Sequence, residues 1–275
     1  MTEAQDSFSW SPSVGPLGEL TAQSRVRARE SRLALAELEA IVAGMPPAVD
    51  FASALRGPNV RVVAELKRSS PSKGTLDGSL DARARTALYV EGGAAALSIL
   101  TEPSRFGGSL ADLRDAHAAV RVPLLRKDFI TDMVQLLEAR AYGASAALLI
   151  ARALSPAELA SLATAAVSMG LTPLIEVRDA RELERALAVR TAVIGVNNRD
   201  LETLVIHPET GVRLIPQVPA DRIAIFESGI TGPEGVKVAA QAGADAVLVG
   251  SVLSTAVAPL ELLHALSSVP RQSRG

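Results

Sequence analysis

Short apolar runs recur along most of the chain, and longer amphipathic stretches separate them. The eight runs are VRVVAELK (60–67), ALSILTE (96–102), VPLLRKD (122–128), AALLIA (146–151), TPLIEV (172–177), AVIGVN (192–197), IAIFES (223–228) and AVLVGS (246–251). Runs that are apolar almost throughout are typical of strands buried on both faces of a parallel sheet. The stretches between them are rich in alanine and leucine and have the length of helices. The pattern therefore predicts alternating strands and helices from about residue 60 onward.

The number of runs indicates how the sheet is arranged. Eight strand–helix units over about 200 residues give about 25 residues to each unit, which is the size of the repeat in a (β/α)8 TIM barrel. Such a barrel closes when its first strand pairs with its last. An open, doubly wound α/β sheet is the alternative. We expect the closed barrel, because the runs number eight.

The residues before the first run predict a helical extension of the barrel. Residues 1–16 are polar, acidic and proline-containing, and we expect them to form a disordered tail. Residues 17–43 predict one helix, which ends at Gly44. The apolar anchors of this helix are Leu17, Leu20, Leu35, Leu38 and Val42. We therefore expect one barrel domain over residues 17–275, with an N-terminal helix as part of it.

Composition excludes several classes of function. The chain of 275 residues has a net charge of −2, which argues against a surface for nucleic acid. It has no cysteine, which excludes disulfides, thiolate catalysis and cysteine-ligated metals, and its three histidines lie away from the strand ends. The first residues lack a signal-peptide pattern, and no apolar run reaches the roughly 20 residues of a membrane span. We expect a cytoplasmic protein that binds no metal, nucleic acid or membrane.

Polar residues gather at the ends of the predicted strands. Seven of the eight runs end in or next to a polar residue, and these residues are Glu65 and Lys67, Thr101 and Glu102, Lys127 and Asp128, Glu176, Asn197, Glu227 and Ser228, and Ser251. In a parallel barrel the C-terminal ends of all strands meet at one rim, where enzymes of this fold hold their active sites. Residues that are scattered in the sequence are therefore expected to meet in space.

Glu65 and Lys67 are the most specific part of this pattern. Positions two apart on a strand share one face, so the two side chains lie together at the rim. An opposite charge offsets the cost of burying each of them, and a purely structural ion pair is the alternative interpretation. Lys127 and Glu176 supply a second lysine and carboxylate on other strands. Two such sets in one pocket suit general acid and base chemistry, because neighbouring charges separate their pKa values.

Glycine and serine near three strand ends indicate a phosphate site. The loop RSSPSKG (68–74) follows the first strand, and ESGI (227–230) and VGSV (249–252) end the last two. Backbone N–H groups can bind an anion there, and the loops after strands 7 and 8 are the usual phosphate site of this fold. The alternative is that these glycines only form tight turns.

Seven motifs in this order resemble the indole-3-glycerol-phosphate synthase family from about residue 17 to about residue 265. They are AELKRSSPSKG, SILTEPSRFGGSLADL, VPLLRKDFI, LIEVRDARELERAL, IGVNNRDLETL, FESGI and GADAVLVGS. The resemblance implies a carboxy-lyase of tryptophan biosynthesis that needs neither cofactor nor metal. Its substrate would be the sugar phosphate 1-(2-carboxyphenylamino)-1-deoxy-D-ribulose 5-phosphate. Its products would be indole-3-glycerol phosphate, CO2 and water, formed by ring closure, decarboxylation and dehydration.

The resemblance also implies roles for single residues. Lys127 corresponds to the general acid of ring closure and Glu176 to the general base. Lys67 would bind the substrate and could donate the proton for dehydration. The supporting catalytic residues would be Glu65, Asn197 and Glu227. The substrate-binding residues would be Phe106 and Phe129 at the aromatic ring, Leu148 as the apolar floor, Arg199 near the anthranilate carboxylate, and Ser70, Ser228, Gly229, Gly250 and Ser251 at the phosphate.

One residue departs from the family pattern close to the site. Position 226 is Phe, where the family usually has a small residue. On a strand its side chain points away from the Glu227 face, so we expect it to pack behind the barrel. Two other functions remain possible: an isomerase acting on a related sugar phosphate, and a non-catalytic barrel that binds a phosphate ligand. We expect the protein to be a monomer.

Overall fold

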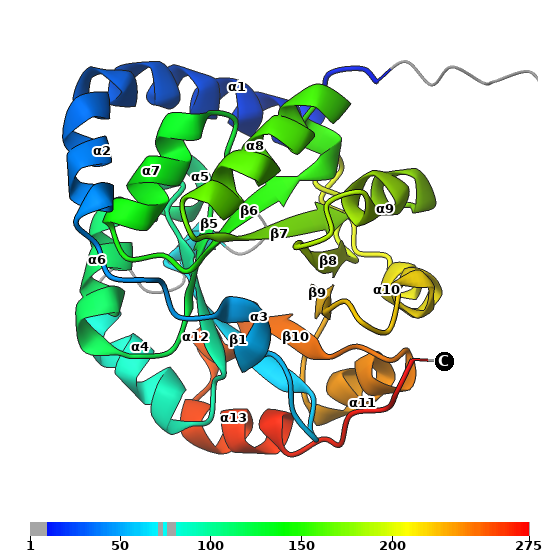
Figure 1. Ribbon diagram of the computed structural model, residues 1–275. Helices are drawn as coiled ribbons and strands as arrows, with labels where there is room; N and C mark the ends of the chain where they lie inside the picture. The colour runs from blue at the N-terminus through cyan, green and yellow to red at the C-terminus, as the bar shows by residue number, and fades with distance from the viewer. Residues whose placement is uncertain (1–9, 71–73, 76–80, 275) are drawn as a thin grey trace, which may run out of the picture.

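The computed structural model describes residues 10–70, 74–75 and 81–274, and it confirms the predicted (β/α)8 barrel (Figure 1). The closed barrel has the strand order β1-β10-β9-β8-β7-β6-β5-β4, and every pairing in it is parallel. Its strands are β1 (Arg61–Leu66), β4 (Ala96–Leu100), β5 (Leu124–Lys127), β6 (Ala146–Ile150), β7 (Thr172–Val177), β8 (Val193–Asn197), β9 (Ala224–Glu227) and β10 (Ala246–Val249). The loop after β1 adds a small antiparallel pair, β2 (Ser69–Ser70) with β3 (Gly74–Thr75).

Helices surround the barrel (Figure 1). The helices are α1 (Gly15–Ser31), α2 (Leu35–Ala43), α3 (Phe51–Ala54), α4 (Ala82–Glu91), α5 (Pro103–Phe106), α6 (Leu110–Ala119), α7 (Met133–Ala141), α8 (Pro156–Ser168), α9 (Ala180–Leu187), α10 (Glu209–Leu214), α11 (Pro233–Gln241), α12 (Ser251–Thr255) and α13 (Pro259–Ser267). Three short 3-10 turns complete the architecture: η1 (Arg32–Ala34), η2 (Ala151–Ala153) and η3 (Ile215–Gln217). Among the described residues, no helix has the length and apolar character to cross a membrane.

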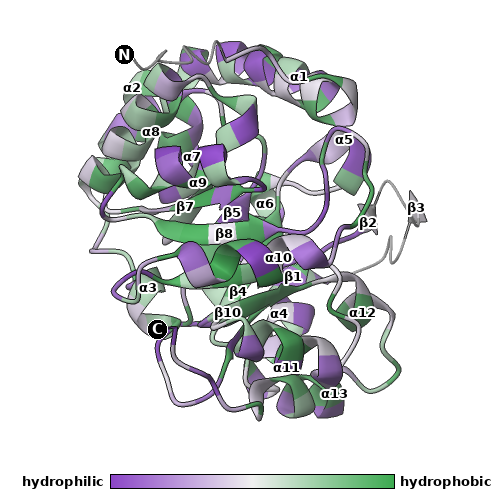
Figure 2. Ribbon diagram, turned by 90° about the vertical axis from the view of Figure 1, so that its right-hand side faces the viewer, coloured by the Kyte–Doolittle hydropathy of each residue, from purple (hydrophilic) through white to green (hydrophobic). Residues whose placement is uncertain are grey.

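Strand side chains divide between two hydrophobic cores. On β1, Val62 and Ala64 point outward into the core between strands and helices, while Val63 points into the barrel interior. This alternation follows from the two-residue repeat of a strand, and it explains why the strands are apolar on both faces. Figure 2 shows β8 and β10 as hydrophobic along most of their length, whereas the helices around them carry both hydrophobic and hydrophilic positions.

The N-terminal ends of the strands form a closed floor. The side chains of Phe51 in α3 and of Leu55 just after it are fully buried in the interior core. Asp50 caps this short helix by accepting a hydrogen bond of 3.0 Å from the backbone N–H of Ser53. The floor is therefore sealed by apolar side chains, and access to the barrel is from the opposite end, which we call the mouth.

The N-terminal extension differs from the single helix expected over residues 17–43. It forms two helices, α1 and α2, with η1 between them, and they point in different directions (Figure 1). Leu17 and Leu20 of α1 pack into the interior core, whereas Leu38 of α2 packs against α7. Only α1 reaches the interior core, and the chain turns between the two helices at η1, where Leu33 is exposed. Residues 1–9 of the expected disordered tail lie outside the described residues, and the last two residues of that tail already belong to α1.

Phe226 lies behind the barrel, as the strand alternation predicted. Its side chain is 4% exposed and belongs to the core between strands and helices. A Cβ atom on Gly211 of α10 would lie 2.4 Å from its ring, so the glycine makes room for the aromatic side chain. The larger residue is therefore accommodated outside the mouth.

Candidate active site

The mouth brings together six charged or amide side chains from five strands. Glu65 comes from β1 and Lys67 follows that strand, while Lys127, Glu176, Asn197 and Glu227 come from β5, β7, β8 and β9. Five of them line one cavity of about 100 Å³: Glu65, Lys67, Lys127, Asn197 and Glu227. Glu176 does not line this cavity, but its Oε2 atom lies 3.0 Å from Nζ of Lys127, which does. The closed parallel barrel is the cause, because it directs every C-terminal strand end to this one place.

Lys67 and Glu65 form a buried pair. The Nζ atom of Lys67 donates a hydrogen bond of 2.8 Å to Oε1 of Glu65 and contacts the hydroxyl of Ser251 at 3.2 Å. Burial alone would raise the pKa of Glu65, but attraction to Lys67 and Lys127 outweighs it and lowers the pKa. Glu65 is therefore a carboxylate that keeps its negative charge at neutral pH.

Lys127 has carboxylates on two sides. Its Nζ atom lies 3.0 Å from Oε2 of Glu176 and 3.7 Å from Oε2 of Glu227. Burial opposes the charge on Lys127, but Glu176, Glu227 and Glu65 together outweigh this effect and raise the pKa of the ammonium group. Lys127 therefore carries a proton at neutral pH, as a general acid must before it acts.

Glu227, in contrast to Glu65, has a raised pKa. Burial, followed by repulsion from Glu176 and Glu65, outweighs the attraction of Lys127 and raises the pKa of Glu227 to about 8. Its Oε1 atom is buried without a hydrogen-bond partner among the described residues. The mouth thus holds carboxyl groups with different proton affinities, which is the arrangement that acid–base catalysis uses.

Two glycines provide the space for these carboxylates. A Cβ atom on Gly195 would lie 2.1 Å from Oε1 of Glu227, and one on Gly250 would lie 2.3 Å from Oε1 of Glu65. Gly250 was predicted as a phosphate-binding residue, whereas sequence reasoning did not identify Gly195. Its signal in the sequence is a glycine inside a strand, which often marks a close approach of another group to the backbone.

The residues predicted to bind phosphate lie on one side of the same cavity. Ser228, Gly229, Gly250 and Ser251 all line it. Ser228 and Gly229 have left-handed φ angles of 65° and 83°, so the chain turns sharply directly after β9. The side chain of Ser70 lies outside the described residues, although its backbone pairs with Gly74 in the small hairpin after β1.

The residues predicted to contact the aromatic ring pack in the interior core and do not line this cavity. Leu148 is 2% exposed and Phe129 is 7% exposed, and both belong to the interior core. The rings of Phe106 and Phe129 lie 6.4 Å apart between centroids, with an angle of 33° between their planes. Leu17 and Leu20 extend this apolar surface from α1. The sequence predicted these two leucines as helix anchors and did not connect them with the site.

Asn197 and Arg199 link two adjoining cavities. Both residues line the main cavity and a smaller one of about 20 Å³ that also contains Glu176. The side chain of Asn197 accepts a hydrogen bond of 2.9 Å from the backbone N–H of Arg199. Burial lowers the pKa of the Arg199 guanidinium, and one of its nitrogens donates to the carbonyl of Leu204 at 2.8 Å. Arg199 is thus a cation held close to the catalytic candidates.

Three polar residues at strand ends do not join the cavity. Asp128 follows Lys127 directly and therefore points outward, where it binds Arg126 at 3.1 Å and Thr101 at 2.8 Å. Glu102 is fully buried and caps α5 through the backbone N–H groups of that helix. The prediction that all the strand-end residues meet in one place was wrong for Thr101, Glu102 and Asp128, because the direction of each side chain decides its position.

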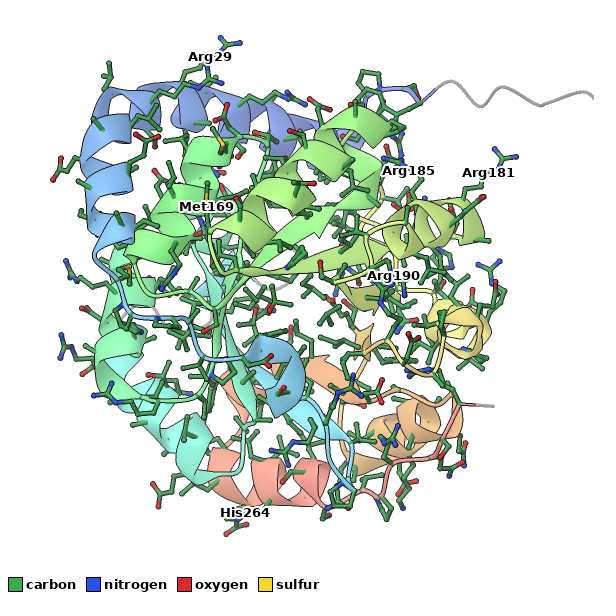
Figure 3. All side chains as sticks on the ribbon, viewed as in Figure 1. Arg29, Met169, Arg181, Arg185, Arg190 and His264 are labelled. Atoms are coloured by element: carbon green, nitrogen blue, oxygen red, sulfur yellow. The ribbon has the colours of Figure 1, made fainter. Side chains whose placement is uncertain are left out.

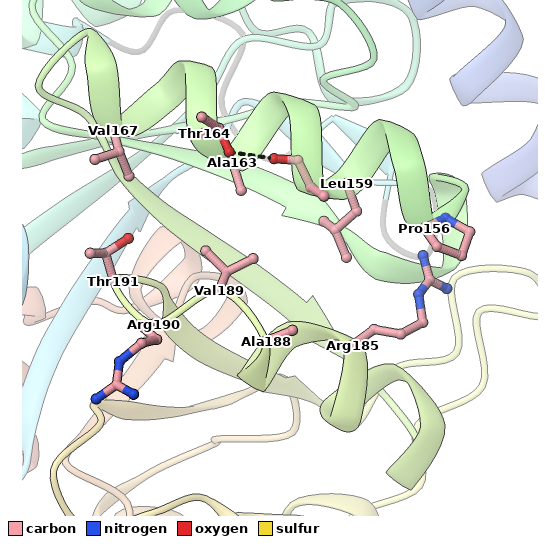
Figure 4. A pocket seen from close by; sticks show the side chains of 11 residues that line it. Pro156, Leu159, Ala163, Thr164, Val167, Arg185, Ala188, Val189, Arg190 and Thr191 are labelled. Carbon is pink, nitrogen blue, oxygen red and sulfur yellow. Dashed lines mark hydrogen bonds between the residues drawn. The ribbon is translucent and has the colours of Figure 1, made fainter.

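Features outside the mouth offer less chemistry. A groove of about 480 Å³ between α8 and the end of α9 is lined mainly by apolar side chains, with Arg185 and Arg190 among them (Figure 4). It contains none of the predicted site residues. His264 lies on the outer surface at α13 (Figure 3). In the part of the chain that the structure describes, no group of three or more histidine, aspartate and glutamate side chains is placed to hold a metal ion.

The sequence of this chain is similar to one protein family over most of its length. The sequence pattern of the family described as indole-3-glycerol phosphate synthase matches residues 20–266. A protein of that name from Streptomyces griseus is 50% identical over 227 residues, which cover 82% of this chain and 84% of that protein. The protein of the same name from Rhodococcus jostii is 47% identical over 255 residues, covering 90% of this chain and 95% of the relative.

Solved structures with low sequence identity share the fold. The 3-hexulose-6-phosphate synthase from Salmonella typhimurium superposes with a TM-score of 0.61 at 15% identity, over 76% of this chain and 97% of that one. Thiamine phosphate pyrophosphorylase from Pyrococcus furiosus gives a TM-score of 0.56 at 15% identity, over 77% of this chain and 95% of that one. At this identity the likeness concerns the barrel alone.

Proposed function

This chain belongs to the indole-3-glycerol phosphate synthase family, and we propose that its mouth converts 1-(2-carboxyphenylamino)-1-deoxy-D-ribulose 5-phosphate into indole-3-glycerol phosphate, CO2 and water. The activity is that of a carboxy-lyase in tryptophan biosynthesis. The observation that carries the proposal is the position of Lys127, whose Nζ atom lies 3.0 Å from Glu176 and 3.7 Å from Glu227. These distances give a buried acid and a buried base in direct contact.

Ring closure is the step that needs the acid. The aromatic carbon that bears the carboxylate attacks the ketone carbon of the sugar, and a new carbon–carbon bond forms. The ketone oxygen takes a proton from Lys127 and becomes a hydroxyl group. The raised pKa of Lys127 keeps that proton in place until the oxygen gains negative charge. Loss of CO2 then leaves its electron pair in the ring and restores aromaticity, so this step requires no separate electron acceptor.

Dehydration completes the reaction. Glu176 takes a proton from the new five-membered ring, and the hydroxyl group leaves as water after protonation by Lys67. Glu65 keeps Lys67 charged and oriented through their contact of 2.8 Å. Asn197 of β8 and Glu227 of β9 are proposed to assist Lys67, Lys127 and Glu176 in these steps.

Residues in and around the cavity are proposed to bind the two ends of the substrate. Ser228, Gly229, Gly250 and Ser251, together with Ser70, are proposed to bind the phosphate. Phe106 and Phe129 are proposed to contact the aromatic ring above Leu148, with Arg199 near its carboxylate. An apolar wall beside fixed charges strengthens each electrostatic contact. We further propose that the protein uses neither metal nor cofactor, because its own lysines and carboxylates supply the acid–base chemistry. We also propose that it is a cytoplasmic monomer.

The test is indole fluorescence after mixing the purified protein with the substrate in the presence of a chelator. We expect product from the intact protein and a loss of activity of at least about 10³-fold in a Lys127→Ala variant. A Lys237→Ala variant is the matched control, because Lys237 is an exposed lysine of α11 paired with Glu234. Binding of the substrate without product would favour the non-catalytic alternative, and no binding would contradict the substrate assignment.

A further inference from the structure

Arg27 of α1 contacts two carboxylates that lie outside the catalytic cavity. Its Nη2 atom is 2.8 Å from Oδ1 of Asp128, and its Nη1 atom is 3.7 Å from Oε1 of Glu102. The side chain of Arg27 is 27% exposed, whereas those of Glu102 and Asp128 are 0% and 1% exposed. One guanidinium group from the N-terminal extension therefore joins the loops that follow β4 and β5.

Each of these carboxylates holds the backbone of one aromatic residue of the mouth. Glu102 accepts hydrogen bonds through Oε2 from the backbone N–H groups of Arg105 at 2.8 Å and Phe106 at 3.2 Å. Asp128 accepts through Oδ1 from the backbone N–H of Phe129 at 2.8 Å. That oxygen of Asp128 is the one that Arg27 contacts. Arg27 thus acts on both phenylalanines through the groups that fix their backbone positions.

The helix that carries Arg27 is anchored to the same loop by a second contact. The hydroxyl of Ser24, one turn earlier on α1, donates to the carbonyl of Phe129. Gln135 of α7 donates to that hydroxyl at 2.8 Å, so the position of Ser24 is itself fixed. Two successive turns of α1 therefore hold the Phe129 loop, and Arg27 extends this connection to the Phe106 loop.

We infer that Arg27 is a positioning residue that sets the gap between the rings of Phe106 and Phe129 and thereby the fit of the aromatic half of the substrate. This inference rests on the proposed function, because it assumes that the ring binds beside these two side chains. A guanidinium group suits this role, since its planar set of N–H donors can contact two carboxylates at once. Arg27 does not touch the cavity that holds the charged groups, so it affects ring binding and leaves the phosphate site unchanged.

The experiment compares an Arg27→Gln variant with an Arg29→Gln variant. Arg29 is an exposed arginine on the same helix and points outward from it (Figure 3). Two inhibitors separate the two ends of the substrate: the substrate reduced at its ketone, which keeps the aromatic ring, and ribulose 5-phosphate, which lacks it. We expect Arg27→Gln to lower the affinity for the ring-bearing inhibitor and to raise KM by about tenfold. Its kcat should stay within about threefold of that of the unchanged protein. The affinity for ribulose 5-phosphate should remain unchanged.

An Arg27→Lys variant guards against a general loss of folding. Lysine keeps the charge of Arg27 but lacks its planar fork. Arg27→Lys should therefore have the thermal stability of the unchanged protein but only part of its affinity for the ring-bearing inhibitor. Equal weakening of both inhibitors, or no change in either, would overturn the inference. If the unchanged protein itself forms no product, the proposed function fails. If it is active and Arg27→Gln behaves like Arg29→Gln, only the role of Arg27 fails.

Discussion

The two ends of the barrel both bury carboxylates, but they treat them differently. At the floor, Asp245 has a partner for each oxygen: Oδ1 contacts Arg271 at 2.9 Å, and Oδ2 contacts Arg274 at 2.8 Å and the backbone N–H of Ala224 at 2.9 Å. At the mouth, one oxygen of Glu227 has no partner among the described residues. The floor carboxylate is therefore fully paired, whereas one mouth carboxyl group keeps an oxygen without a hydrogen bond.

This difference separates stability from chemistry. Breaking a buried ion pair by removing one partner is strongly destabilising, because the other charge stays buried without compensation. A buried carboxyl group whose attraction to a cation does not offset its burial instead has a raised pKa, as Glu227 shows with its pKa of about 8. We conclude that the floor uses its buried charge to hold the fold, whereas the mouth keeps its charge available for proton transfer.

The largest expected effect comes from removing the proposed base at the mouth. A Glu176→Gln variant should lose about 10³-fold in kcat, because glutamine keeps the shape but cannot accept the proton. Its melting temperature should fall less than that of a variant without the floor carboxylate Asp245, because Lys127 keeps Glu227 and Glu65 as neighbouring carboxyl groups. The two quantities are measured by indole fluorescence and by thermal unfolding. A variant that retains more than about a tenth of the activity would contradict the role of Glu176.

The floor should give the reverse result. An Asp245→Ala variant leaves Arg271 and the buried Arg274 without this partner, so we expect the free energy of unfolding to fall by about 3 kcal/mol in urea titrations. KM and kcat of the folded fraction should not change. Asp221, which is exposed at the same end, supplies the control Asp221→Ala. If Asp245→Ala lowered kcat without lowering stability, the two ends would not be separate.

A smaller effect should appear in the pH dependence of stability. Glu227 has a pKa of about 8 in the folded protein against 4.5 for the free side chain, so the folded state binds the proton more tightly. Between these two values the folded state holds more protons than the unfolded state, and the free energy of unfolding falls as the pH rises. A Glu227→Gln variant should lack this contribution. We expect it to gain roughly 3–4 kcal/mol relative to the unchanged protein between about pH 5 and about pH 8.

Glu182 requires attention in that measurement. Burial raises its pKa to about 7, so it adds a pH dependence of the same sign. Because Glu182 is present in both proteins, the difference between them isolates Glu227. Parallel stability curves for Glu227→Gln and the unchanged protein would contradict the raised pKa of Glu227.

The strands could be predicted from the sequence because burial on both faces leaves a strong local signal. All eight predicted runs contain the observed strands, from Arg61–Leu66 to Ala246–Val249. The position of the mouth followed from the same pattern, since Glu65 and Lys67 stand at a strand end. The position of Phe226 could also be predicted, because alternation along a strand is a local rule.

Features that depend on contacts distant in sequence could not be predicted in this way. The helix break at Arg32–Ala34 separates α1, which reaches the interior core through Leu17 and Leu20, from α2, which packs against α7 through Leu38. The outward contacts of Asp128 with Thr101 and Arg126 depend on neighbours from other elements. The contribution of Gly195 depends on Glu227, which lies on the adjacent strand. A single sequence shows the residue types at these positions but not which of them meet.

Gly195 and Gly250 constrain how this mouth can change during evolution or redesign. Each occupies a place where a Cβ atom would meet a carboxylate of the mouth within 2.3 Å. A lineage can exchange such a carboxylate for a neutral side chain in one step and keep the empty volume for a later function. If the glycine were exchanged first, its new side chain would fill that volume, and the volume would not be available for a later function. The order of substitutions is therefore part of what the backbone permits: new chemistry at this mouth is reached by changing the acids while the glycines stay.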